Sequence, residues 1–158
     1  MPRKEFIYAG IIWTLLFAGM SFYWAAGGML GVKSLGGEIY QMALDRDQDF
    51  VPIVWATGII KLVGVLFLFI LLREKDFKKL VKCASIICIV AGIFMILYGA
   101  MNFITISLAG LNILDFELGT FAMIWRLIFW EPFWMLGGLL YVLAAKKKKV
   151  HSEFSEER

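Results

Sequence analysis

Long apolar stretches alternate with shorter polar segments along the chain, and four of the apolar stretches could cross a lipid bilayer. A transmembrane helix needs about 20 consecutive, mainly apolar residues. Four stretches meet this requirement: residues 6–28, 51–72, 83–106 and 121–145. The pattern therefore predicts an all-α fold, an integral membrane four-helix bundle. Residues 1–149 would form a single four-span transmembrane domain, and residues 150–158 a polar cytoplasmic tail.

The overall composition also favours a membrane protein. Hydrophobic residues make up 61% and charged residues 18% of the chain, whereas soluble domains are about 45–50% apolar and about 25% charged. A soluble domain of 158 residues could not bury so much apolar surface, so the lipid bilayer is the expected surrounding. The net charge of +3 does not indicate a nucleic-acid partner, because the basic residues lie beside apolar stretches and form no separate basic domain.

The positions of Lys and Arg predict the orientation of the chain. The 22-residue loop 29–50 contains only Lys33 and Arg46, and the loop before the fourth stretch contains no basic residue. The N-terminus, the loop before the third stretch and the end of the fourth stretch carry 11 basic residues: Arg3, Lys4, Arg73, Lys75, Lys78, Lys79, Lys82, Lys146, Lys147, Lys148 and Lys149. Short cytoplasmic loops are enriched in Lys and Arg. We therefore expect a multi-pass protein of the cell membrane with both termini cytoplasmic and loop 29–50 outside, where residues 36–50 could form a short surface helix.

Three charged residues interrupt the predicted spans: Lys61 in the second, and Arg126 and Glu131 in the fourth. A charge at the centre of a transmembrane helix costs about 2.5–3.5 kcal/mol on insertion scales, so such residues usually face the bundle interior and pair with one another. Counted from the outer ends of their spans, Lys61 and Glu131 both lie about 15 Å deep. We therefore expect these two side chains to pair near the middle of the bilayer.

The fourth span poses a geometric problem. Arg126 and Glu131 are five residues apart, about 140° around an ideal α-helix, so both cannot face inward. Pro132 lacks a backbone donor and would clash with the carbonyl of Ile128, which favours a kink or a π-bulge. Either distortion would rotate Arg126 relative to Glu131. Alternatively, Arg126 extends outward to the lipid head groups.

Helical periodicity gives each span one face of polar or small residues. Four such faces could enclose an outward-opening polar pocket with the Lys61 and Glu131 pair as its floor. The candidate ligand-binding residues are Lys61, Glu131, Arg126, Asn102, Thr57, Ser21 and Tyr98. Cys83 and Cys88 match neither a redox nor a zinc spacing. We predict no metal site, no cofactor and no catalytic residue.

Three functions are compatible with these features. The first, which the intramembrane charges favour, is binding or transport of a small anionic or amphipathic ligand, or of an ion or proton, at this pocket. Transport would call for a homodimer, because four helices are few for a path. The second is an accessory or structural subunit whose aromatic faces pack on a membrane partner. The third is an intramembrane lipid-modifying enzyme that uses Glu131 as acid or base. It is disfavoured because no second carboxylate and no nucleophile–base pair accompanies Glu131.

Two short motifs carry a family resemblance. The stretches SFYWAAGGMLG (residues 21–31) and WEPFWMLGGLLY (residues 130–141) resemble an uncharacterised family of small bacterial four-span membrane proteins, known only as a domain of unknown function. Its members are similar in an aromatic-Trp-Ala-x-Gly-Gly motif that ends the first span and a Pro-aromatic motif followed by Leu-Gly-Gly in the last. The matching residues are Trp24, Ala25, Gly27, Gly28, Pro132, Phe133, Leu136, Gly137 and Gly138.

The resemblance covers nearly the whole chain and implies a four-span fold in a bacterial membrane. It implies no activity. Many similar sequences have a His before the Tyr-Trp pair, where this chain has Ser21 or Phe22. Any chemistry that such a His performs is therefore missing from this chain.

Overall fold

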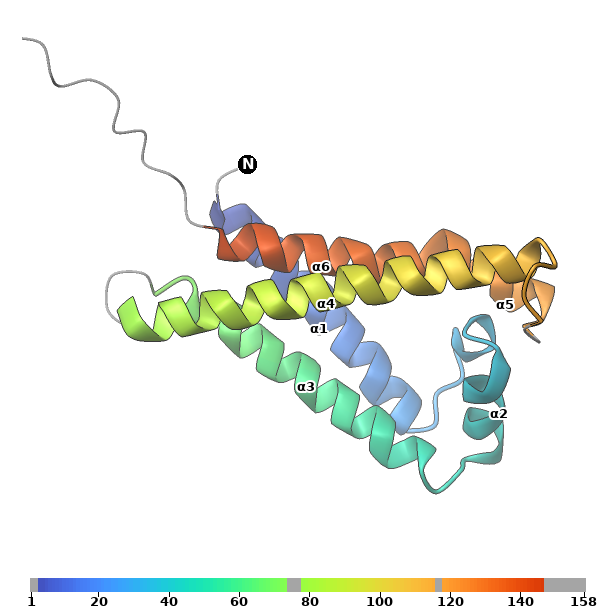
Figure 1. Cartoon of the computed structure of the whole chain (residues 1–158). Helices are drawn as coiled ribbons and strands as arrows, with labels where there is room; N and C mark the ends of the chain where they lie inside the picture. The colour runs from blue at the N-terminus through green and yellow to red at the C-terminus, as the bar shows by residue number, and fades with distance from the viewer. Residues whose placement is uncertain (1–2, 74–77, 116–117, 147–158) are drawn as a thin grey trace, which may run out of the picture.

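The fold is known from a computed structural model, which describes residues 3–73, 78–115 and 118–146 (Figure 1). These residues form helices and loops, with no strand among them. The helices are α1 (Arg3–Ala25), the 3-10 helix η1 (Val32–Ser34), α2 (Gly37–Asp45), α3 (Phe50–Ile70), α4 (Lys78–Gly110), α5 (Thr120–Trp125), the π-helix η2 (Arg126–Trp130) and α6 (Glu131–Ala145). The predicted all-α fold is confirmed for the described residues, whereas the tail 150–158 lies outside them.

Four helical segments are long and apolar enough to cross a membrane: α1, α3, α4 and the continuous segment α5–η2–α6. Their ends differ from the predicted stretches by at most five residues. Their outer surfaces are also apolar, with Leu16, Ile60, Phe94 and Ile128 all more than 60% exposed. In water, exposed apolar surface costs about 25 cal/mol per Å² relative to burial. This surface therefore suits a multi-pass protein in a lipid environment.

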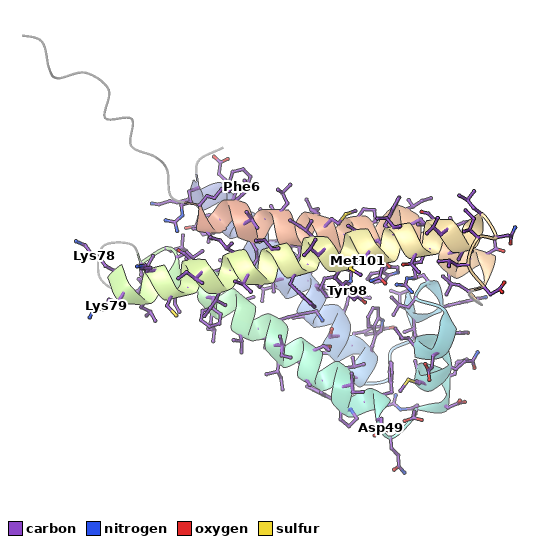
Figure 2. All side chains as sticks on the ribbon, in the orientation of Figure 1. Phe6, Asp49, Lys78, Lys79, Tyr98 and Met101 are labelled. Atoms are coloured by element: carbon purple, nitrogen blue, oxygen red, sulfur yellow. The ribbon has the colours of Figure 1, made fainter. Side chains whose placement is uncertain are left out.

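The four long helices pack in a ring of pairwise contacts. α4 lies along α6, α1 packs against both α3 and α6, and α3 contacts α4. The beginning of α1, the end of α6, the end of α3 and the beginning of α4 lie at one end of the molecule, while α2 and α5 lie at the other (Figure 1). Figure 2 shows Lys78 and Lys79 at the first end and Asp49 at the second. This separation of basic and acidic residues agrees with the expected orientation, which stays a prediction.

Glycines allow the backbones of α4 and α6 to approach closely. A Cβ atom on Gly92 would lie 2.7 Å from the carbonyl oxygen of Gly138, and one on Gly99 would lie 2.8 Å from that of Glu131. Because Gly92 and Gly99 are seven residues apart, both lie on the same face of α4. The close contact therefore extends over two helical turns, which is how small residues let transmembrane helices associate. It also holds the start of α6 firmly against α4.

The loop 29–50 is folded back onto the end of α1. Gly27 adopts a φ of 103°, a left-handed conformation that glycine accepts readily. The guanidinium of Arg46 packs against Gly27 and donates a hydrogen bond of 3.4 Å to the carbonyl of Ala25. The indole of Trp24 donates to the carbonyl of Leu30 at 2.8 Å. These bonds hold both ends of the loop against the end of α1, and the helix expected within this loop is present as α2.

Candidate functional site

The two charges of the last span form an ion pair within that span. The Nε and Nη2 atoms of Arg126 lie 2.8 Å and 2.7 Å from Oε1 of Glu131. Glu131 is 1% exposed, and its Oε2 accepts no hydrogen bond from the described residues. A buried carboxylate needs such a partner, because an isolated ion is strongly disfavoured in an apolar interior. Arg126 therefore neutralises Glu131, and it turns inward and not toward the head groups.

The π-helix η2 brings these two residues together. The backbone N–H of Glu131 donates to the carbonyl of Arg126, five residues earlier. Residues in this i→i+5 relation stack above one another in a π-turn, whereas they diverge in an α-helix. The wider turn ends directly before Pro132, whose ring would otherwise clash with the carbonyl of Ile128. We expected a kink or a π-bulge at this position, and the structure has the π-bulge.

Lys61 is bound by a different helix from the one that we expected. Its Nζ donates a hydrogen bond of 2.9 Å to Oγ of Ser21 on α1 and lies 4.4 Å from the centre of the Phe17 ring. The expected ion pair between Lys61 and Glu131 does not form among the described residues, because Arg126 occupies the carboxylate from within its own helix. We had paired Lys61 with Glu131 because both lie at a similar depth, but depth does not determine the direction in which a side chain points.

The other candidate residues are dispersed over the bundle. Thr57 donates to the carbonyl of Val54 within its own helix. Tyr98 is 43% exposed, and its ring makes an edge contact with Trp134 at 5.3 Å between centroids. Asn102 is half-buried on α4, without a side-chain hydrogen bond to any described residue. The structure therefore brings together two pairs, Arg126 with Glu131 and Lys61 with Ser21, and leaves Thr57, Tyr98 and Asn102 apart.

A half-open cavity of about 530 Å³ lies between α1, the loop that contains η1, and the segment α5–η2–α6, and its lining residues Leu16, Leu30 and Phe121 are at least half exposed. None of the seven candidate residues lines it. Its wall is mainly aromatic, with the rings of Phe17, Phe121, Trp125, Phe129, Trp130 and Phe133. Leu16, Met20 and Leu30 add aliphatic side chains. This cavity beside the loop is thus apolar and is not the polar pocket that we expected around Lys61 and Glu131.

The polar groups of this cavity come from the loop around η1 and from Trp130 of η2. The indole of Trp130 donates a hydrogen bond of 2.8 Å to Oγ of Ser34, and Ser34 in turn donates to the carbonyl of Gly31 at 2.5 Å. Both polar side chains are therefore satisfied within the wall. Lys33 is exposed, and its Nζ lies 5.6 Å from the centre of the Phe121 ring. Among the described residues, the ammonium of Lys33 therefore has no ion-pair partner beside the aromatic wall.

Sequence reasoning missed this cavity because its wall comes from segments far apart in the chain. Aromatic residues in a membrane span are typical of interfacial belts and of helix packing, so their presence did not indicate a cavity. A usable clue was the aromatic spacing in the last span, where Phe121, Trp125, Phe129 and Phe133 recur every four residues. Such spacing places the rings along one face of a helix.

Comparison with known proteins yields a family and no activity. No curated protein and no solved structure matches the chain significantly. Residues 14–141 match the family described as "Protein of unknown function (DUF3995)". The match includes the polar contacts of Lys61 and Ser21, the π-helix with its ion pair, and every residue that lines the cavity. The match covers most of the four long helices, and the chain therefore belongs to this uncharacterised family, as the motifs of its first and last spans indicate.

Proposed function

We propose that this protein is a multi-pass protein of the cell membrane, with both termini cytoplasmic, that binds a single-chain amphipathic molecule with an anionic head group. The aromatic cavity of about 530 Å³ carries this proposal. Ligand sites in proteins are typically about 300–1,000 Å³, mainly apolar, with a few polar groups that orient the ligand. The cavity has this size and this composition.

The apolar part of the ligand would occupy the cavity itself. The walls offer aromatic and aliphatic side chains, and Ser34 and Trp130 satisfy each other and need no partner from a ligand. A ligand that arrives from the aqueous phase gains about 0.8 kcal/mol for each methylene group that it buries against such a wall. A polar ligand would lose its hydrogen bonds to water on binding, and the wall would not replace them.

The anionic group would bind beside Lys33. This ammonium forms no ion pair with a described residue, and it contacts the face of the Phe121 ring. A head group at the rim would stay hydrated on one side while the tail enters the cavity. Lys33 belongs to the loop 29–50, so the predicted orientation opens the cavity toward the outside.

Energy transfer from tryptophan tests the proposal directly. The purified protein in neutral detergent would be titrated with dansyl-undecanoic acid, and dansyl emission would be recorded on tryptophan excitation. Trp125 and Trp130 line the cavity, whereas Trp55 lies exposed on α3. We expect saturable transfer that falls in Trp125→Phe and Trp130→Phe and persists in Trp55→Phe. Transfer that never saturates, or that depends equally on all three residues, would refute the proposal.

A charge variant tests the head group separately. Lys33→Gln should weaken binding of the acid about threefold to fivefold, in line with the small energies of exposed ion pairs. The uncharged probe dansyl-undecanol should bind the variant and the original protein equally. Lys79→Gln is a matched control, because Lys79 is exposed at the opposite end of the molecule. Equal loss in the two lysine variants would rule out a specific contact at Lys33.

A further inference from the structure

The ring of Phe17 contacts both the cavity and the ammonium of Lys61. Phe17 lines the cavity, and the same ring lies 4.4 Å from Nζ of Lys61. Lys61 itself does not line the cavity. One side chain therefore borders both an apolar binding space and a cation in the middle of α3.

Lys61 has no counter-charge among the described residues. An ammonium carries three donors. One bonds to Ser21, and the Phe17 ring offers only its face to the charge. Glu131 does not compensate, because Arg126 already neutralises it. A cation in a membrane span is costly, and such residues are almost always paired or placed on a ligand or ion path. The donors left over at Lys61 therefore suit an anion that the protein chain does not supply.

We propose that Lys61 and Ser21 form a second, deeper anion-binding position for the ligand of the cavity, reached when the Phe17 ring moves aside. This inference rests on the proposed function. The head group would bind first beside Lys33 at the rim and then beside Lys61, while the acyl chain stays in contact with the aromatic wall. The chemical class of the ligand is thereby narrowed to an acyl chain with a compact anionic head, such as a carboxylate, that can pass a single ring.

The Phe17 ring borders the cavity on one side and is packed on the other. Its neighbours Trp130 and Phe133 also line the cavity, with ring centroids 6.4 Å and 5.4 Å from that of Phe17. The rings of Trp13 and Trp134 do not line it and lie 5.3 Å and 4.8 Å from Phe17, so the ring must give up these edge contacts when it turns into the cavity. When the ring leaves, Nζ of Lys61 loses its contact with the aromatic face, and a carboxylate replaces that contact with a charge-assisted hydrogen bond. The exchange favours the anion over an uncharged head group.

A double-mutant cycle tests this second position. Dissociation constants for dansyl-undecanoic acid and dansyl-undecanol would be measured for the original protein, Phe17→Leu, Lys61→Met and the double variant. The quantity of interest is the preference for the acid over the alcohol. Phe17→Leu should raise this preference about tenfold, as expected for one hydrogen bond to a charged group. Lys61→Met should abolish the increase, whereas Lys61→Arg should retain most of it.

Three other outcomes would overturn the inference. If Phe17→Leu strengthens binding of both probes equally, the smaller side chain merely enlarges the cavity. If the acid preference depends on Lys33 and is unaffected by Lys61→Met in the Phe17→Leu background, the proposed function stands and the second position does not exist. If neither probe binds the original protein saturably, both proposals fail. Monodisperse elution and an unchanged unfolding temperature of each variant would show that folding is intact. If Phe17→Leu fails this control, Phe17→Ile would be used in its place.

Discussion

Arg126 holds Glu131 through two nitrogens on a single carboxylate oxygen, with Nε at 2.8 Å and Nη2 at 2.7 Å from Oε1. The pair is internal to one span, so the last helix neutralises its own charges without a partner from a neighbouring helix. The π-turn makes this possible, because it stacks residues five apart. As a consequence Lys61, at similar depth in α3, binds no carboxylate of the described residues and contacts Ser21 and Phe17 instead.

Replacing Arg126 by Met should destabilise the protein strongly. Glu131 would remain buried without its partner, and breaking a buried ion pair from one side costs about 3–5 kcal/mol. The double variant Arg126→Met with Glu131→Gln should recover most of this loss, because no uncompensated charge remains. Unfolding by denaturant in mixed micelles measures both effects. A double variant as unstable as the single one would show that Arg126 acts through packing and not through charge.

The four spans were predictable because an apolar stretch of about 20 residues has few alternatives to a membrane helix. The π-helix was predictable as well, since the spacing of Arg126 and Glu131 and the position of Pro132 all pointed to a distorted turn. The partner of Glu131 was not predictable, because residue counts give the depth of a residue along a helix but not the direction in which its side chain points. The cavity escaped prediction because Phe17 and Trp130 lie 113 residues apart and meet only after the helices pack.

The close approach of α4 and α6 should be intolerant of added side-chain volume. Gly92→Ala would place its Cβ 2.7 Å from the Gly138 carbonyl oxygen, and forcing extra atoms into a packed interface typically costs about 1–3 kcal/mol. Gly19→Ala is the matched control, because nothing lies within 4 Å of that position on α1. The control should be neutral or stabilise the helix by up to about 1 kcal/mol. Equal unfolding temperatures for the two variants would contradict the tight α4–α6 contact.

A hydroxyl group links three helices in the other half of the bundle. Tyr141 on α6 shares a hydrogen bond of 3.0 Å with Thr14 on α1, and a Cβ on Gly64 of α3 would lie 2.5 Å from the same hydroxyl oxygen. Gly64→Ala should therefore destabilise the protein by about 1–3 kcal/mol. In a Tyr141→Phe background the penalty of Gly64→Ala should shrink, because the clashing oxygen is gone. Strictly additive losses in unfolding free energy would show that Gly64 and Tyr141 do not interact.

The orientation determines which compartment can reach the cavity. Lys33 at its rim belongs to the same loop as Gln48, which is exposed, whereas Lys79 is exposed at the opposite end of the molecule. After replacement of Cys83 and Cys88 by Ser and Ala, Gln48→Cys and Lys79→Cys would be treated with a membrane-impermeant maleimide. Gln48→Cys should be labelled in intact cells, and Lys79→Cys only after the membrane is opened, because basic loops are retained in the cytoplasm. The reverse pattern would turn the cavity toward the cytoplasm, and any amphipathic ligand would then have to come from the inner leaflet or the cytosol.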